Sequence, residues 1–261
     1  MSVEGTILRI LMIGDVVGRP GRRALQRFLP GLINDYDLSL VIANGENSAG
    51  GIGITPDTAK ELCDCGVDVI TTGNHVWAKK EIIPHLDGDL PIIRPLNFPP
   101  TAPGRGFLEM KGALIINLMG RVFIGQYDCP FRTIDCLLSD SQTKSKVIIV
   151  DFHAEATSEK VAMGRYLDGR VSAMLGTHTH VATADADILP KGTAYVTDVG
   201  MVGPADSVIG VDTQSAIRSF LTGMPHRFFV SEGAVKFDAI IVEVDEATGR
   251  AVSIKRIHLK E

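Results

Sequence analysis

Carboxylate, amide and imidazole side chains occur in five short segments that are far apart in the sequence. The composition of these segments suits cations such as iron, manganese or zinc, which accept oxygen and nitrogen donors. Glycine beside the donors permits tight turns and lets the backbone approach an ion or a phosphate closely. The segments therefore indicate a metal site. They are Gly14-Asp15, Gly45-Glu46-Asn47, Gly73-Asn74-His75, Asp151-Phe152-His153 and Gly176-Thr177-His178-Thr179-His180.

His178 and His180 are separated by a single residue. In an extended segment, residues two apart point to the same side of the chain. This spacing would suit two ions about 3.5–4 Å apart, each bound by one imidazole. Glu46 carries two carboxylate oxygens and could bridge the two ions. The pattern therefore favours a site for a pair of ions.

Each polar segment follows an apolar run that is typical of a buried strand. In the first half, apolar runs at residues 7–13, 38–43 and 67–71 alternate with helix-like stretches at residues 22–32, 56–65 and 72–85. This β-α-β-α-β alternation predicts an α/β fold with a mainly parallel sheet. Loops after the carboxyl ends of parallel strands lie along one sheet edge. We therefore expect the polar segments to converge in space.

The second half is expected to be richer in strands, with a proline-rich connector at residues 91–103 before it. Helices are expected at residues 158–167 and 213–222. The chain shows no internal repeat and no clear linker, so a single domain over residues 1–261 is the simplest organisation. The expected strands are residues 113–118, 122–125, 147–151, 171–175, 194–197, 239–244 and 252–259.

Composition and charge exclude several classes of protein. The 261 residues are 45% hydrophobic and 22% charged, which is ordinary for a globular enzyme. A net charge of −5 without a basic block argues against general nucleic-acid binding. The first six residues lack the features of a secretory signal, and no apolar run approaches the roughly 18 residues that cross a bilayer. We expect a cytoplasmic protein with no membrane attachment.

Four cysteines occur, and no two have the C-x-x-C spacing of a redox or zinc motif. A core of this size does not depend on disulfides for its stability. Buried or half-buried thiols in a reducing compartment are therefore expected at Cys63, Cys65, Cys129 and Cys136.

Taken together, the polar segments resemble the calcineurin-like metallophosphoesterase superfamily, and more closely its YmdB-like branch of bacterial phosphoesterases. The resemblance runs nearly end to end and includes Tyr166-Leu167-Asp168-Gly169-Arg170-Val171 and Thr197-Asp198-Val199-Gly200-Met201. It implies an α/β four-layer αββα sandwich with two mixed sheets and a homo-oligomeric enzyme. It also implies a dinuclear centre, with iron or manganese and zinc as the alternative. The implied activity is hydrolysis of small phosphodiesters, 2′,3′-cyclic nucleotides among them.

The sequence departs from the wider superfamily at the first metal motif. Asp15-Val16-Val17 lacks the histidine of the usual Asp-x-His, and Glu46 stands where a bridging aspartate is common. As in the YmdB-like branch, the carbonyl oxygen of Asn47 can take the vacant ligand position. The resemblance then implies Asp15, Glu46, Asn47 and His180 on one ion, and Glu46, Asn74, His153 and His178 on the other.

The expected reaction is in-line attack on phosphorus by a hydroxide that bridges the two ions. The leaving oxygen then needs a proton. His75 follows the ligand Asn74 and is not expected to be a ligand itself, so it is the expected general acid.

Other interpretations stay open at this point. Gly14-x-x-x-Gly18-x-x-Gly21 could suggest a dinucleotide fold, but its spacing is wrong and Asp15 would repel a pyrophosphate. A phosphomonoesterase or nuclease could use the same centre, as could a metal-dependent regulatory protein with incidental hydrolysis. Among nearby residues, Asp151 and Glu155 could orient His153 or be solvated. Four further residues could contact substrate, although a solvated helix face or core packing is the default: Arg19, Arg22, Trp77 and Tyr127.

Overall fold

The computed structural model describes residues 6–140 and 145–261. The expected lack of a secretory signal rests on the first six residues. Residues 1–5 lie outside the described range. The described strands form two mixed sheets. The first has the order β2-β11-β12-β1-β3-β4, with β13 paired to β12, and the second has the order β5-β6-β7-β8-β10-β9.

The strands of the first sheet are β1 (Ile7–Ile13), β2 (Asp15–Val16), β3 (Leu40–Asn44), β4 (Val69–Thr71), β11 (Met201–Pro204), β12 (Val235–Asp245) and β13 (Ala251–Lys260). Those of the second are β5 (Phe107–Met110), β6 (Ala113–Met119), β7 (Val147–His153), β8 (Ala173–Thr177), β9 (Asp187–Ile188) and β10 (Ala194–Val196). The helices are α1 (Gly18–Tyr36), α2 (Pro56–Asp64), α3 (Pro130–Leu138), α4 (Thr157–Leu167) and α5 (Thr213–Thr222), with a 3₁₀ helix, η1, at Lys80–His85.

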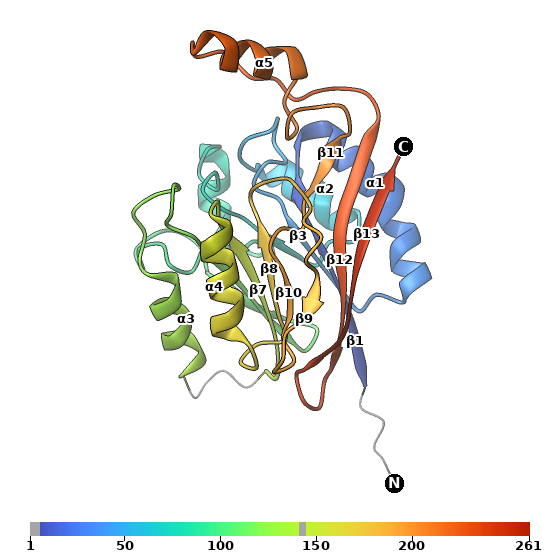
Figure 1. Cartoon of the computed structure of the whole chain (residues 1–261), viewed down its shortest axis with the longest axis vertical. Coiled ribbons are helices and arrows are strands. Elements are labelled where there is room, and N and C mark those ends of the chain that lie inside the picture. Colours follow the sequence, from blue (N-terminus) through green and yellow to red (C-terminus); the bar gives the residue numbers. More distant parts are fainter. Residues whose placement is uncertain (1–5, 141–144) are drawn as a thin grey trace.

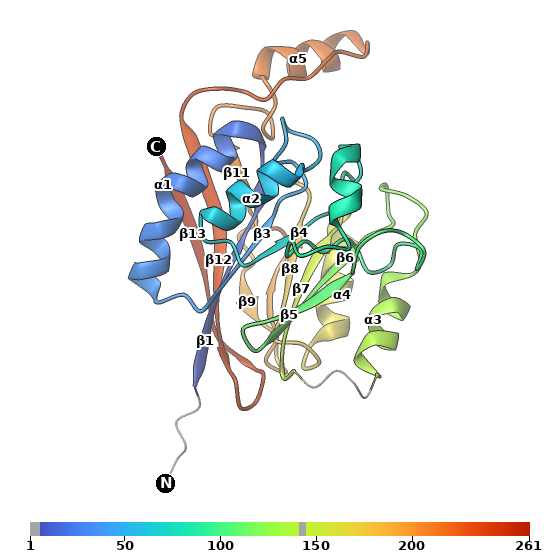
Figure 2. The ribbon, with the colours of Figure 1, turned by 180° about the vertical axis from the view of Figure 1, so that it is seen from behind.

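Helices cover the outer face of each sheet, and the two inner faces pack on each other (Figures 1 and 2). One apolar cluster joins α1 and α2 to the first sheet, a second lies between the sheets, and a third joins α3 and α4 to the second sheet. In β1, Leu11 and Ile13 belong to the first cluster while Ile10 and Met12 belong to the second. This alternation follows from the two-residue period of a strand. The expected four-layer αββα sandwich with two mixed sheets is confirmed.

The parallel runs explain how the polar segments meet. Strands β1, β3 and β4 are parallel in the first sheet, and β6, β7, β8 and β10 are parallel in the second. The expectation of one sheet edge is therefore wrong in one respect. Three polar segments follow strands of the first sheet, whereas His153 is the last residue of β7 and His178 follows β8, both in the second sheet.

The strand expected at residues 122–125 is wrong, because this segment is a turn. The backbone N–H groups of Arg121 and Val122 donate to the carboxylate of Glu159, so they do not pair with a strand. Phe123 has a φ of 64° and an exposed fraction of 90%. A left-handed backbone of this kind does not occur in regular strands.

Two helices differ from their expected bounds. Helix α1 begins at Gly18 and continues to Tyr36, with Pro20 in its first turn, where the missing N–H of proline costs little. The helix expected after β4 is instead a series of turns followed by η1, which contains Pro84. Proline inside a helix removes a hydrogen bond and clashes with the preceding turn, so no long α-helix forms there.

Helix α3 and strand β11 were not predicted. Phe131, Ile134 and Leu138 of α3 do have helical spacing, so the signal was present in the sequence. By contrast, β11 contains Gly203 and Pro204, which are uncommon inside strands.

Helix α5 has the bounds expected from the sequence and projects beyond the sandwich in both views (Figures 1 and 2). Asp212 caps its first turn by accepting a hydrogen bond from the N–H of Ser215. Phe220 and Leu221 are 85% and 81% exposed. Among the described residues, no helix is both long enough and apolar enough to span a bilayer.

Candidate metal centre

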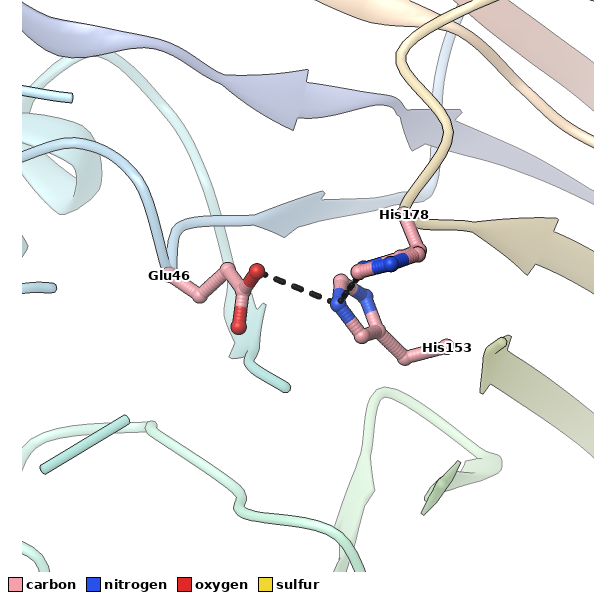
Figure 3. A group of neighbouring side chains, drawn as sticks. All are labelled: Glu46, His153 and His178. Atoms are coloured by element: carbon pink, nitrogen blue, oxygen red, sulfur yellow. Dashed lines mark hydrogen bonds and ion pairs between the residues drawn. The ribbon is translucent and has the colours of Figure 1, made fainter. Parts of the chain in front are cut away.

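The structure gathers all eight predicted site residues at the carboxyl ends of five parallel strands. Glu46, His153 and His178 form the inner group, shown in Figure 3. One donor atom from each of these three residues lies within 4.8 Å of the others. His153 Nε2 is 3.1 Å from Glu46 Oε1 and 3.0 Å from His178 Nδ1. Asn74 Oδ1 approaches the same His153 nitrogen at 3.2 Å.

A second group of side chains meets the inner group at the same oxygen, Oε1 of Glu46. Asn47 Nδ2 lies 3.3 Å from Glu46 Oε1 and 3.2 Å from His180 Nε2. His180 Nε2 is in turn 3.6 Å from Asp15 Oδ1. The two groups of side chains therefore share Glu46, as the assignment of two ligand sets requires. Whether these residues bind metal in these two sets stays a prediction.

His178 belongs to the inner group and His180 to the second group. The backbone between them is not extended, although an extended segment was expected. Strand β8 ends at Thr177, and the φ angles of His178 and His180 are 103° and 63°. Residues other than glycine adopt positive φ rarely, and such strain is common at functional sites. The two imidazoles diverge because the backbone bends between them.

The imidazole of His153 is held by hydrogen bonds on its far side. Its Nδ1 lies 2.9 Å from Thr177 Oγ1, and the Thr177 hydroxyl donates to Asp151 Oδ1 at 2.6 Å. Thr177 Oγ1 therefore accepts a hydrogen bond from Nδ1–H of His153. A hydrogen bond of this kind fixes the ring and its tautomer, so that in the neutral imidazole the lone pair lies on Nε2, the nitrogen that faces Glu46. Burial raises the pKa of Asp151 to about 6.

His180 is held in the same way by the loop before α5. Its Nδ1 lies 2.8 Å from the carbonyl oxygen of Ile209, which can only accept a hydrogen bond. The Nδ1–H of His180 therefore donates to this carbonyl, and Nε2 faces Asp15 and Asn47. Glu155 contacts His178 Nε2 at 3.0 Å rather than His153. Of the two residues considered for orienting His153, only Asp151 does so, through Thr177.

Charges in the site offset the cost of burial. Burial alone would raise the pKa of Glu46, but His153 and His75 lower it well below its ordinary value. Burial alone would lower the pKa of His153, yet the neighbouring carboxylates, Glu46 foremost, raise it to about 9. Burial and the adjacent positive charge of His153 lower the pKa of His178 to about 4. Without a cation, the proton on His153 thus partly balances the negative charge of the site.

Gly73 shows why glycine accompanies these donors. A Cβ atom at this position would lie 2.3 Å from His153 Cδ2 and 2.5 Å from Glu46 Oε2. Any side chain would therefore push apart two members of the inner group. The expectation that glycine permits close approach at the site holds at this position.

The donor groups open into a cavity of about 290 Å³. His75 lies at its wall, with a side chain that is 35% exposed. Its Nδ1 is 3.1 Å from Asn47 Oδ1 and 3.5 Å from Glu46 Oε1, and its backbone N–H donates to Glu46 Oε2. Another part of the wall is apolar and consists of Val17, Ile209, Val211 and Val230.

The four residues that could contact substrate do not line this cavity, namely Arg19, Arg22, Trp77 and Tyr127. Trp77 and Tyr127 both pack against Phe98, with ring centroids 4.9 and 4.7 Å away, so core packing is confirmed for both. Arg22 does not line the cavity; its side chain is half-buried, pairs with Glu61 and donates to the carbonyl of Ser48. The cysteines are free thiols; Cys136 is exposed, against expectation, while the other three are half-buried.

The chemistry of the residues fits cations. Asp15 is fully buried, and its Oδ1 accepts no hydrogen bond from any described group. A desolvated carboxylate oxygen without a donor is unfavourable unless a cation balances it. Together with the imidazoles and amides, such carboxylates form a donor set that suits iron, manganese or zinc.

Two stacked mixed sheets with a donor-rich cavity at their carboxyl ends define the metallophosphoesterase-like class of α/β proteins. The chain belongs to the YmdB-like protein family, whose model matches residues 11–257. A relative from Bacillus subtilis (strain 168), named 2′,3′-cyclic-nucleotide 2′-phosphodiesterase, is 46% identical over 258 residues, which cover 97% of this chain and 98% of that protein.

Two solved structures share the fold. A hypothetical protein from Thermus thermophilus is 47% identical, with a TM-score of 0.91 and coverage of 97% of this chain and 100% of that chain. A phosphatase from Mycoplasma pneumoniae is 35% identical, with a TM-score of 0.92 and coverage of 98% and 95%. The chain is accordingly an enzyme of the phosphodiesterase and phosphatase class, the hydrolases of phosphoric esters.

Proposed function

We propose that the chain hydrolyses phosphodiesters of small nucleotides, 2′,3′-cyclic nucleotides among them, with the help of two cations. The position of Glu46 between two groups of donor side chains is the observation that carries this proposal. The name of the Bacillus subtilis relative, which is similar over nearly its whole length, supports the substrate class.

The cations would be iron or manganese, with zinc as the alternative. The residues that would hold one ion are Asp15, Glu46, Asn47 and His180, and those for the other are Glu46, Asn74, His153 and His178. When bound, such ions lower the pKa of water and offset negative charge on phosphoryl oxygens. The chain itself fixes the donor atoms, through Thr177 for His153 and through the Ile209 carbonyl for His180.

His75 would protonate the leaving oxygen. Its Nδ1 is occupied by Asn47 and Glu46, which orients the ring and leaves Nε2 for the substrate. The ring lies at the cavity wall, where a substrate oxygen can reach it. A positioned general acid of this kind supplies about 10²–10⁴-fold in rate.

The cavity wall favours a diester over a monoester. None of the described residues that line it is lysine or arginine. A phosphomonoester carries close to two negative charges at neutral pH, because its second pKa is about 6, whereas a diester carries one. The apolar wall of Val17, Ile209, Val211 and Val230 offers a surface for the ribose or base.

The test is a comparison of substrates with manganese-loaded and iron-loaded enzyme. We expect kcat/KM to be higher for 2′,3′-cyclic nucleotides than for nucleoside monophosphates or short RNA. A preference for monophosphates would favour the phosphatase alternative, which the name of the Mycoplasma relative makes the second candidate. Hydrolysis too slow to matter with every ester would favour the regulatory interpretation.

We also propose that the enzyme is a cytoplasmic homo-oligomer. Large apolar side chains on and after α5 are exposed in the single chain, namely Ile217, Phe220, Leu221, Met224, Phe228 and Phe229. Exposed apolar patches of this kind commonly mark protein interfaces, and a second copy would cover them. Light scattering should give a multimer for the wild-type chain and a smaller species for Phe220→Ser/Leu221→Ser. A wild-type monomer would contradict this.

A further inference from the structure

Lys160 and Asp198 form an ion pair next to the site, although neither is among the predicted donors. Lys160 Nζ lies 2.6 Å from Asp198 Oδ2, and both side chains have an exposed fraction of 0%. Burying two charges costs free energy, and apolar residues of similar size are often at least as stable in such places. A gain in stability therefore does not explain why the chain contains this ion pair. The hydrogen bonds that Asp198 makes suggest another role for it.

Each carboxylate oxygen of Asp198 holds a different loop of the site. Oδ2 accepts hydrogen bonds from the N–H and the hydroxyl of Thr179, at 3.0 and 2.8 Å. Oδ1 accepts one from the N–H of Gly200, at 2.9 Å. The carbonyl of Gly200 in turn accepts a hydrogen bond from the N–H of Asp15 at 3.0 Å. One carboxylate thus links the loop of the two imidazoles to the loop of Asp15.

Thr179 is the residue between His178 and His180, both of which have positive φ. This backbone conformation is unfavourable for residues with side chains and persists only where the surroundings fix it. The two hydrogen bonds from Thr179 to Asp198 are the contacts that fix the middle of this loop. Loss of Asp198 would let the loop relax and would move both imidazoles.

The side chain of Lys160 passes close to Gly176 on its way to Asp198. A Cβ at Gly176 would lie 3.1 Å from Lys160 Cδ and 1.9 Å from the carbonyl oxygen of Thr197. A side chain at residue 176 would therefore collide with the backbone of Thr197 and crowd Lys160. The lysine donates to Asp198 and balances its buried charge.

We propose that Asp198, supported by Lys160, is a positioning residue for the metal centre. It sets the backbone around Thr179 and Gly200, and it thereby places the donor atoms of His178, His180 and Asp15. The proposal rests on the proposed metal centre, but not on the identity of the substrate. The segments at residues 176–180 and 197–201 thus have a joint role, because Asp198 in the second segment holds Thr179 in the first.

The test measures Mn²⁺ binding to metal-free protein by calorimetry, with the melting temperature measured in parallel. Asp198→Ala should bind Mn²⁺ about 10–100-fold more weakly, as is typical when the support of a metal ligand is lost. Lys160→Met/Asp198→Asn should recover part of the affinity, because the amide oxygen can still accept from Thr179 and no charge is left unpaired.

Asp168→Ala is the matched control. Asp168 is also a buried carboxylate that accepts backbone hydrogen bonds, from Lys191, but it contacts none of the site loops. It should keep the wild-type Mn²⁺ affinity even if its melting temperature falls as far as that of Asp198→Ala. An equal loss of affinity in Asp168→Ala would overturn the proposal, since general destabilisation would then explain the result.

Wild-type affinity in Asp198→Ala would also overturn it. If Asp198→Ala does not fold, Thr179→Val replaces it, because this variant removes only the hydroxyl donor. Thr179→Val should bind Mn²⁺ severalfold more weakly, and unchanged binding would refute the positioning role of Asp198. If the wild-type chain itself bound no Mn²⁺, the proposed function would fail, and the positioning role with it.

Discussion

Asp15 Oδ1 lies 3.6 Å from Nε2 of His180, beyond hydrogen-bond distance, and accepts no hydrogen bond from any described group. Both atoms therefore face the same space without satisfying each other. Glu46 lies between this pair and the group of His153 and His178. The carboxylate of Asp15 therefore stands with the imidazole of His180, whereas the side-chain donor atoms of the inner group come from other residues.

Asp15→Asn should lose one of the two cations and keep the other. The amide is a neutral and weaker ligand, whereas the donors of the inner group are unchanged. Metal analysis after loading with Mn²⁺ should give about one ion per chain, against about two for the wild type. Asp168→Asn should keep both. Two ions in Asp15→Asn would show that Asp15 is not a ligand.

Glu46→Gln should lose both cations and nearly all activity. Glu46 Oε1 is 3.1 Å from His153 Nε2 and 3.3 Å from Asn47 Nδ2, so it is the carboxylate common to both groups. Removing its charge weakens each position at once. Metal content and kcat should fall together, and full occupancy by two ions would remove Glu46 from the bridging position.

His75→Ala should retain both metals but lose about 10²–10⁴-fold in kcat on 2′,3′-cyclic nucleotides. The sharper measurement uses a second diester with two p-nitrophenyl groups. Its leaving group is a weak base that departs without a proton, so the variant should lose much less activity on it. Equal losses on both substrates would contradict the role of His75 as an acid and point to a structural effect.

The sequence predicted most of the strands and the convergence of the polar segments, because both depend on local signals. Apolar runs such as residues 7–13 became β1 within a residue of their bounds, and the donors follow the strands directly. The sequence did not predict that the donors come from two sheets, because pairing between distant strands leaves no local pattern. It was the family resemblance that implied two sheets.

Contacts that depend on packing could not be inferred from the sequence at all. The bend at His178 and His180 comes from tertiary hydrogen bonds to Asp15, Asp198 and Ile209, whereas the local spacing suggested an extended segment. Likewise, the apolar residues 122–124 look like a strand, but the carboxylate of Glu159 takes the N–H groups of Arg121 and Val122. In both places a distant polar group overrides the local preference.

The strength of cation binding should rise with pH between about 6 and 8. In metal-free protein, burial would lower the pKa of His153, but Glu46, Asp15 and Asp151 raise it to about 9. A protonated His153 therefore stabilises the metal-free fold fully below its unfolded pKa of about 6.5, and this stabilisation is lost as the pH rises through about 9. A cation that binds Nε2 must displace this proton.

Calorimetry with Mn²⁺ at pH 7 in two buffers of different ionisation enthalpy should report the release of about one proton per chain. The gain in melting temperature on adding Mn²⁺ should also grow with pH. No proton release, together with a gain that does not change with pH, would show that the cation does not bind His153.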